Sequence, residues 1–296
     1  MALDPDYVRD TKLAGLLGDR IWTAFFSNYG RLREIQKKSI PLILDGQDLL
    51  ISAATASGKT EAACAPLVRR CQKKYGNQWT ILYVCPTRAL VNDLYQRLRT
   101  PVEGANFSIH RRTGDYTAKL TQHKNILITT PESFDSLMCR GKYDDGSGHI
   151  LSNVNAIVLD EIHLLHGSPR GEMVRWLIAR LKKLRENAKN KGWAVDDRVQ
   201  VIALSATVSD PKSISDQYLS NGQLISSPGS RDIKTFGNGG NIQNELPEYL
   251  GSTEKKEKVL VFCRSRKKSE KLSEDLKGKL KSLGYSTAVH HGSLPK

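Results

Sequence analysis

The residues best suited to chemistry form a short loop near the N-terminal end of the 296-residue chain, Ala53-Ala54-Thr55-Ala56-Ser57-Gly58-Lys59-Thr60. The loop follows an apolar run and opens a helix-like pattern. Backbone N–H groups at a helix N-terminus face an anion, and the helix dipole favours negative charge there. We therefore expect residues 55–60 to bind the phosphates of a nucleotide. Lys59 would neutralise the β- and γ-phosphates, and Thr60 would hold Mg²⁺.

The loop matches the pattern G-x-x-x-x-G-K-[ST] except at its first glycine, where Ala53 stands. On these residues alone, a Ser-Gly-Lys-Thr turn without a ligand is an alternative. The rest of the chain must decide between the two.

A pair of carboxylates is the second candidate group. Asp160 and Glu161 follow the apolar run AIVL and are followed by Ile162 and His163. An acidic residue at the carboxyl end of a buried parallel strand would lie beside the phosphate loop. Asp160 would then bind Mg²⁺ through water, and Glu161 would polarise the attacking water. An acidic first helical turn is the alternative, but the upstream Gly-Lys-Thr loop favours the nucleotide site.

A parallel sheet would bring these groups together. Short apolar runs alternate with amphipathic stretches, among them the helix-like residues 60–74 and 88–99. This alternation predicts an α/β fold with helices on both faces of the sheet. The expected strands are 48–52, 80–85, 107–111, 125–129, 156–160 and 199–204.

Composition narrows the class of protein. The chain has 39% hydrophobic residues and a formal net charge of +14. The charge favours a polyanionic partner, although a solvated basic surface explains it equally well. Five scattered cysteines predict reduced core thiols in a cytoplasmic protein. No signal peptide or apolar stretch of about 18 residues occurs, so no membrane segment is expected.

These motifs resemble those of a superfamily 2 helicase of the DExH type, and in particular the large-helicase-related (Lhr) group of DNA helicases. The resemblance runs from about residue 29 to residue 296. It implies a RecA-like P-loop NTPase sheet that uses ATP and Mg²⁺, followed by the start of a second RecA-like domain. In the adenine-binding segment YGRLREIQKKSIP, Tyr29 would stack on the base and Gln36 would read its edge. A core aromatic is the alternative for Tyr29.

Further segments resemble the motifs with which the family contacts one nucleic-acid strand. Hydroxyls, an arginine and helix N-termini suit phosphate contacts that carry no sequence information. Each segment also has a structural alternative, such as a helix start at Thr130-Pro131. The expected contact residues are Pro86, Thr87, Arg88, Thr113, Gly114, Asp115, Thr130, Pro131 and Glu132, with Ser265 and Arg266 in the second domain.

Two other segments carry the resemblance. Ser205-Ala206-Thr207 resembles the motif that couples the two sites, with a helix cap as the alternative. The resemblance implies that His163 touches this motif or the γ-phosphate region and is not a general base. The segment HGSPRG at 166–171 also resembles the Lhr group.

The chain departs from the family at the loop, which usually reads APTGSGKT. Ala54 replaces Pro and Ala56 replaces Gly. Alanine costs nothing at a negative φ but about 1 kcal/mol or more at a positive φ. Family motifs V and VI are absent, and motif VI normally supplies arginine fingers. The resemblance therefore implies a missing C-terminal motor domain as a partner, in cis or in trans.

We expect a helical lead-in at 1–28, the first RecA-like domain at 29–226, a linker at 227–257 and an incomplete second domain at 258–296, with strands at 259–262 and 286–290. The favoured function is an ATP-dependent motor core acting on single-stranded or tailed duplex DNA in the 3′ to 5′ direction. One alternative is a non-catalytic ATP- and nucleic-acid-binding module or half of a split motor. Another is an RNA helicase, because phosphate contacts do not separate RNA from DNA.

Overall fold

The computed structural model describes residues 5–72, 79–114, 125–140, 148–206, 208–227, 241–253 and 256–290. The chain divides into two compact units, Met1–Ser230 and Arg231–Lys296. The expected domain borders, which place a linker at 227–257, stay predictions. Asp115, Thr207 and residues 291–296 lie outside the described residues, so their expected roles also stay predictions.

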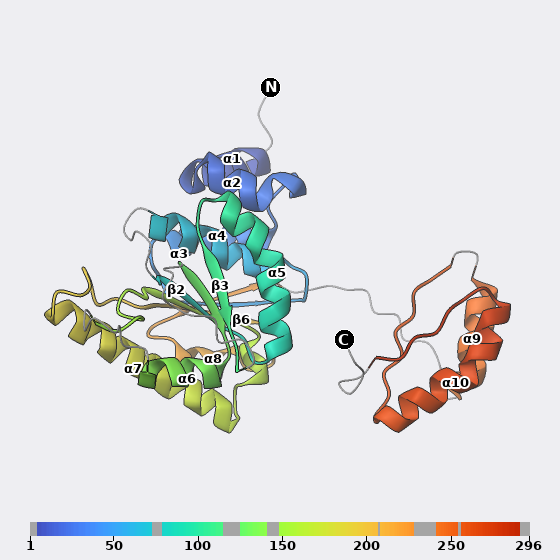
Figure 1. The fold of residues 1–296 in the computed structure, drawn as a ribbon. Helices are drawn as coiled ribbons and strands as arrows, with labels where there is room; N and C mark the ends of the chain where they lie inside the picture. Colours follow the sequence, from blue (N-terminus) through green and yellow to red (C-terminus); the bar gives the residue numbers. More distant parts are fainter. Residues whose placement is uncertain are drawn as a thin grey trace. The chain divides into compact units, whose positions relative to one another are not determined.

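A seven-stranded parallel sheet forms the centre of the first unit (Figure 1). Its strand order is β3-β4-β2-β5-β6-β1-β7. Six strands correspond to the expected runs, but β7 was missed because its sequence QLISS is largely polar and mostly exposed at the edge. The strands are β1 Leu49–Ala53, β2 Ile81–Val84, β3 Ile109–Arg112, β4 Ile126–Thr129, β5 Ala156–Leu159, β6 Gln200–Ser205 and β7 Gln223–Ser227.

Helices cover both faces of this sheet, because successive strand residues point to opposite sides. Ile51 belongs to a core shared with the first five helices, whereas Leu50 belongs to a core shared with α6, α7 and α8. This arrangement confirms the expected fold class. The helices are α1 Pro5–Leu17, α2 Asp19–Phe26, α3 Glu34–Leu44, α4 Lys59–Gln72, α5 Arg88–Gly104, α6 Pro131–Arg140, α7 Pro169–Asn190 and α8 Pro211–Tyr218, with short 3₁₀ turns η1 Ser27–Tyr29 and η2 Ile162–Leu164.

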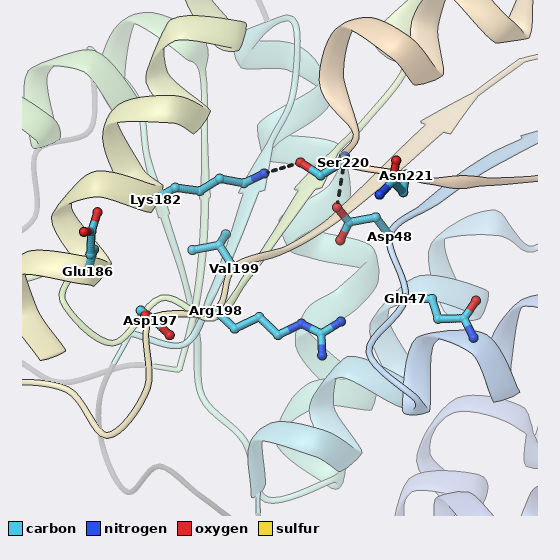
Figure 2. A pocket seen from close by; sticks show the side chains of 9 residues that line it. All are labelled: Gln47, Asp48, Lys182, Glu186, Asp197, Arg198, Val199, Ser220 and Asn221. Carbon is cyan, nitrogen blue, oxygen red and sulfur yellow. Dashed lines mark hydrogen bonds between the residues drawn. The ribbon is translucent and has the colours of Figure 1, made fainter.

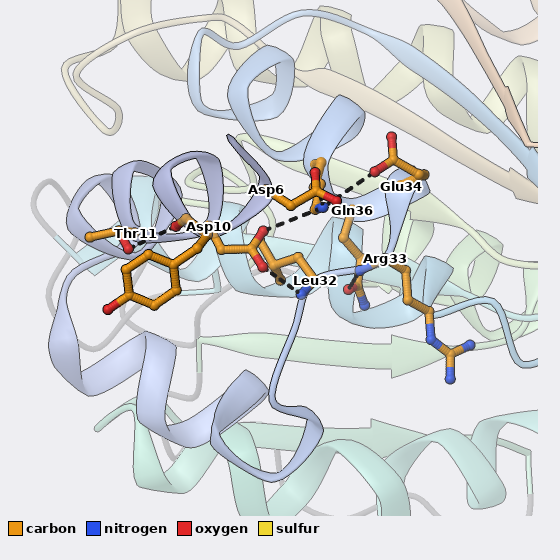
Figure 3. A network of polar contacts seen from close by, with 9 residues as sticks. Asp6, Asp10, Thr11, Leu32, Arg33, Glu34 and Gln36 are labelled. Atoms are coloured by element: carbon orange, nitrogen blue, oxygen red, sulfur yellow. Dashed lines mark hydrogen bonds and ion pairs between the residues drawn. The ribbon is translucent and has the colours of Figure 1, made fainter. Parts of the chain in front are cut away.

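A buried lysine, Lys37, joins α1 to α3. Figure 3 shows the polar network around its partners Asp6 and Glu34. Lys37 Nζ lies 2.8 Å from Asp6 Oδ1 and 3.3 Å from Glu34 Oε1. Asp10 Oδ2 accepts a hydrogen bond from the backbone N–H of Leu32 at 3.3 Å. The hydrogen bond from Lys37 to Asp6 raises the pKa of Lys37 and keeps it charged. This network fixes the N-terminus of α3, which faces the candidate site.

The second unit contains α9 Ile242–Ser252 and α10 Arg266–Ser282, packed around Leu250, Leu276 and Leu280. The strands expected at 259–262 and 286–290 are not formed. A strand needs a hydrogen-bonded partner, and the described part of this unit supplies none. Phe262 is accordingly 87% exposed.

Two other expectations concern cysteines and membranes. Cys64, Cys71 and Cys85 are buried as expected, but Cys139 is exposed and Cys263 is partly exposed, so the expectation of core thiols is wrong for these two. None of the helices in the described ranges is long and apolar enough to cross a bilayer.

Candidate functional site

The candidate residues of the first unit gather at one edge of the sheet. Carboxyl ends of parallel strands meet at the same edge, where ligands bind in open α/β sheets. Six of the segments singled out in this unit come at or directly after such an end, whereas Tyr29, Gln36 and the segment 166–171 do not. The strand–segment pairs are β1 with the phosphate loop, β2 with Pro86, β3 with Thr113, β4 with Thr130, β5 with Asp160 and β6 with Ala206.

Lys59 begins α4 and points back into the phosphate loop. Its Nζ donates to the carbonyls of Ala53 at 2.7 Å and Ala54 at 3.0 Å. Burial lowers the pKa of Lys59, while Glu161 and Asp160 act in the opposite direction. Lys59, Asp160 and Glu161 line the same cavity, as a Mg-nucleotide site requires.

The phosphate loop uses two left-handed residues. Gly58 has a φ of 84°, and a Cβ there would collide with the side chain of Gln36. Ala56 has a φ of 61°, so the condition under which this alanine costs stability is met. The loop backbone thus follows a path suited to glycine at both positions, although only one of them is glycine.

Two side chains at the N-terminus of α3 donate hydrogen bonds to this loop. The Arg33 guanidinium donates to the Ala56 carbonyl, and Gln36 Nε2 donates to the Gly58 carbonyl at 3.3 Å. Gln36 Oε1 in turn accepts from the Arg33 backbone N–H at 2.9 Å. Sequence reasoning missed Arg33, because a single arginine three residues before Gln36 forms no motif. The adenine-reading role of Gln36 stays a prediction.

Asp160 and Glu161 differ in environment. Burial and the neighbouring Glu161 raise the pKa of Asp160 to about 7, although Arg97 and Lys59 oppose this shift. Glu161 has a φ of 43°, a conformation that non-glycine residues adopt at a cost and that is common at functional sites. Glu161 Oε2 is buried and has no hydrogen-bond partner among the described residues, although His163 Nδ1 lies 3.3 Å away.

A cavity of about 300 Å³ joins these groups. Tyr29 lines it and is 61% exposed, so the core-aromatic alternative is wrong. Arg97 of α5 also lines it, 3.7 Å from Glu61, and was not anticipated because it belongs to no motif. The phosphate-loop residues Thr55, Ala56, Ser57, Gly58, Lys59 and Thr60 line the same cavity, together with Gln36, Asp160 and Glu161.

These residues fit a nucleotide with Mg²⁺. The Ser57 hydroxyl and Glu161 Oε2 are buried without a hydrogen-bond partner in the described parts of the chain. Buried polar atoms of this kind cost free energy unless a ligand or water pairs with them. A phosphate group and a hydrated cation would satisfy both. Lys59 and Thr60 would hold the phosphates and the cation, and Asp160 would hold the cation.

A larger cavity of about 780 Å³ lies at the opposite edge of the sheet (Figure 2). Asp48, Val199 and Asn221, which line it, all precede strands. Its polar groups bind one another: Lys182 Nζ donates to Ser220 Oγ at 2.9 Å, and Asp48 Oδ2 accepts from the Ser220 backbone N–H at 3.3 Å. None of the expected site residues lines this cavity.

His163 connects the carboxylates to the coupling segment. Its Nδ1 lies 3.4 Å from both Ser205 Oγ and the Ala206 backbone nitrogen. Ser205 is the last residue of β6, whereas α8 is capped by Asp210, which accepts from the Ser213 backbone N–H at 3.0 Å. The helix-cap alternative for this segment is therefore wrong.

Two groups of expected nucleic-acid contacts, at 86–88 and 130–132, lie at helix starts. Thr87 Oγ1 accepts from the Leu90 backbone N–H at 3.2 Å and caps α5. Thr130 Oγ1 accepts from the Ser133 backbone N–H at 3.4 Å, and Pro131 begins α6. The helix start at Thr130-Pro131 is thus confirmed, and a phosphate contact at the same N-terminus stays a prediction.

The other candidate contact residues differ from one another in exposure and in structural setting. Arg88 is exposed and close to Gly114, where an added Cβ would lie 3.0 Å from Arg88 Nη2, whereas Thr113 is buried. In the second unit, Ser265 Oγ accepts from the Lys268 backbone N–H at 3.3 Å and caps α10, which Arg266 begins. The nucleic-acid roles of these residues stay predictions.

Comparison with known proteins decides the family. Residues 33–214 match the DEAD/DEAH box helicase family. The chain belongs to this family. This confirms the resemblance to superfamily 2 helicases and the identification of a helicase domain.

The curated relatives of this chain include a member of the Lhr group. The chain is 27% identical over 280 residues to the ATP-dependent DNA helicase MER3 homolog of Oryza sativa subsp. japonica, covering 85% of this chain and 23% of that protein. It is 31% identical over 218 residues to the ATP-dependent helicase Lhr-Core of Sulfolobus acidocaldarius, covering 68% of this chain and 23% of the relative. The chain thus spans about a quarter of the length of these relatives.

A solved structure shows the same fold. Mycobacterium smegmatis helicase Lhr bound to ssDNA and AMP-PNP superposes with a TM-score of 0.71 at 23% sequence identity. The match covers 96% of this chain and 39% of that one.

Proposed function

We propose that this helicase domain is the ATP-binding half of a motor that hydrolyses ATP and moves along DNA. The observation that carries the proposal is the single cavity that contains the phosphate loop, Asp160, Glu161 and the exposed ring of Tyr29. Aromatic ring, cations and carboxylates in one cavity suit a purine nucleotide with Mg²⁺.

The residues would divide the work as their environments suggest. ATP supplies the phosphoryl bond whose cleavage drives movement. Lys59 neutralises the negative charge of the phosphates, and Asp160 binds the cation. Glu161, held in a strained conformation with a buried oxygen, orients the attacking water. His163 contacts Ser205 and Ala206 at the end of β6, and so couples nucleotide binding to the position of this segment.

DNA is the proposed track, with movement in the 3′ to 5′ direction. The rice relative is named a DNA helicase, and the superposed Lhr structure holds single-stranded DNA. The net charge of +14 is consistent with a polyanionic partner. We further propose that a second motor domain, in cis or in trans, supplies the arginines that make hydrolysis fast.

Replacement of Lys59 tests the nucleotide site. Lys59→Ala removes the phosphate-neutralising charge, and we expect ATP binding by titration calorimetry to weaken at least roughly tenfold. The matched control is Lys183→Ala, which removes an exposed lysine paired with Glu186 on the outer side of α7. Equal ATP affinity in Lys59→Ala and the wild type would refute the nucleotide site.

Turnover and substrate assays separate the remaining functions. ATPase activity stimulated by single-stranded DNA supports a motor, whereas ATP binding without turnover supports the binding-module alternative. Competition between DNA and RNA oligonucleotides of matched sequence tests the track. Unwinding of duplexes with a 3′ or a 5′ tail tests the direction.

A further inference from the structure

Arg170, the fifth residue of the segment HGSPRG, joins two loops at the carboxyl edge of the sheet. Its Nε donates to Glu132 Oε1 at 2.7 Å, and its Nη2 donates to the Pro86 carbonyl at 2.6 Å. Pro86 lies between β2 and α5, and Glu132 lies in the first turn of α6 after β4, the neighbour of β2. One guanidinium at the start of α7 therefore links two of the segments to which nucleic-acid contacts are assigned.

We infer that Arg170 is a positioning residue for the nucleic-acid interface, which neutralises the Glu132 carboxylate and fixes the peptide before Thr87. This inference rests on the proposed function, because it assumes that phosphates approach these loops. Two N–H groups of Arg170 are already hydrogen-bonded within the protein. Arg170 therefore acts through Glu132 and Pro86.

The charge of Glu132 makes such a partner necessary. The Glu132 side chain is 56% exposed, so an approaching phosphate chain would meet it. Burial raises the pKa of Glu132, but the hydrogen bond from Arg170 and those from the helix start outweigh it, and the net pKa is lowered. The carboxylate is therefore ionised at neutral pH. Without Arg170, it would repel phosphates without a nearby opposite charge.

The second bond fixes the backbone. The Pro86 carbonyl directly precedes Thr87, whose side chain caps α5. Arg170 thereby sets the N-terminus of α5 relative to that of α6, and helix N-termini bind anions through their free N–H groups. An arginine suits this role, because its planar group donates in two fixed directions, which a lysine ammonium does not.

A charge-removal test separates this role from general stability. The variants are Arg170→Ala and the double variant Arg170→Ala/Glu132→Gln, in the full chain. The matched control is Arg180→Ala, because Arg180 Nη1 lies 2.8 Å from Asp135 Oδ1 between the same helices, α7 and α6, with similar exposure. Binding of a fluorescein-labelled oligodeoxythymidylate is measured by anisotropy at low and high salt, and ATP affinity by calorimetry.

We expect Arg170→Ala to weaken oligonucleotide binding roughly tenfold at low salt. The defect should shrink at high salt, because screening reduces the repulsion from Glu132. Glu132→Gln in the double variant should restore most of the affinity, which a folding defect would not allow. Arg180→Ala should bind DNA within about twofold of the wild type, and ATP affinity should be retained in Arg170→Ala.

Wild-type affinity in Arg170→Ala would overturn the inference. A loss that Glu132→Gln leaves wholly unrestored would overturn the role of Arg170 in neutralising Glu132. A wild-type chain that binds ATP but no oligonucleotide would refute the nucleic-acid part of the proposed function, and this inference with it. If the wild-type chain binds the oligonucleotide and Arg170→Ala binds it equally well, this inference alone is refuted.

Discussion

Ala56 stores backbone strain in the phosphate loop. Its φ of 61° places an L side chain in the left-handed region, where alanine is less stable than glycine. We expect Ala56→Gly to raise the free energy of unfolding by about 1 kcal/mol and the Tm by roughly 2–4 °C. Thermal denaturation followed by circular dichroism measures both.

Asn106 provides the control, because it has a φ of 58° and asparagine tolerates this region better than alanine. Asn106→Gly should therefore stabilise the chain less than Ala56→Gly does. An Ala56→Gly variant no more stable than the wild type would show that the strain is relieved elsewhere.

Asp160 links stability to pH. Its pKa is raised to about 7 by burial and by Glu161, whereas an unfolded aspartate titrates near 3.9. Between these values the folded chain binds more protons than the unfolded chain, so this group makes stability fall as pH rises from about 4 to 7. We expect the Tm of Asp160→Asn minus that of the wild type to grow over this range and then level off. A difference independent of pH would contradict the raised pKa.

Residue types and spacing could predict much of the site, because the phosphate loop and the Asp-Glu pair carry their own chemistry. The exposure of Tyr29 and the contact of His163 with Ser205 depend on tertiary packing. Arg33, Arg97 and Arg170 were missed as individual contacts for the same reason. A surface arginine has no local signal of its partner, which can lie dozens of residues away, as Pro86 does from Arg170.

At the scale of elements, α7 is anchored at its C-terminal end by a buried arginine. Arg185 is fully buried, donates to the Ser152 carbonyl, and lies 2.6 Å from Asp196 Oδ1. Asp196→Ala would leave part of a buried guanidinium unpaired, and we expect a loss of about 1–3 kcal/mol in urea denaturation.

The adjacent Asp197 is the control for this prediction. It lies 3.1 Å from Lys189, and both side chains are exposed. Exposed ion pairs add little, so Asp197→Ala should leave stability almost unchanged. Equal losses in the two variants would argue against a specific role for the buried pair.

The positions of strands could be predicted where an apolar run was continuous, as in β5 and β6. The edge strand β7 was missed, because its polar residues do not alternate with buried ones. The strands at 259–262 and 286–290 were expected from apolar residues alone. Pairing, which a single run of residues does not specify, decides whether such a run becomes a strand.

At the scale of the whole molecule, the two units differ in core size. The first unit has two cores on the faces of a sheet, whereas the buried core of the second consists of Leu250, Leu276 and Leu280 in its described part. Few buried contacts mean a low free energy of local opening. We expect amide hydrogen exchange by mass spectrometry to be much faster in α10 than in β5 and β6. Equal protection would indicate that the second unit has a further source of stability.

The carboxyl ends and the amino ends of the strands carry different groups of residues. The phosphate loop, Asp160 and the expected nucleic-acid contacts share the carboxyl edge, while Gln47, Asp197 and Asn221 surround the other cavity at the amino edge. A dye or a surface tether attached through a cysteine at the exposed Asp197 would therefore stand at the far end of the strands from the ligands. Single-molecule recording of the proposed motor could attach at that end of the strands without contacting the proposed ATP and DNA sites.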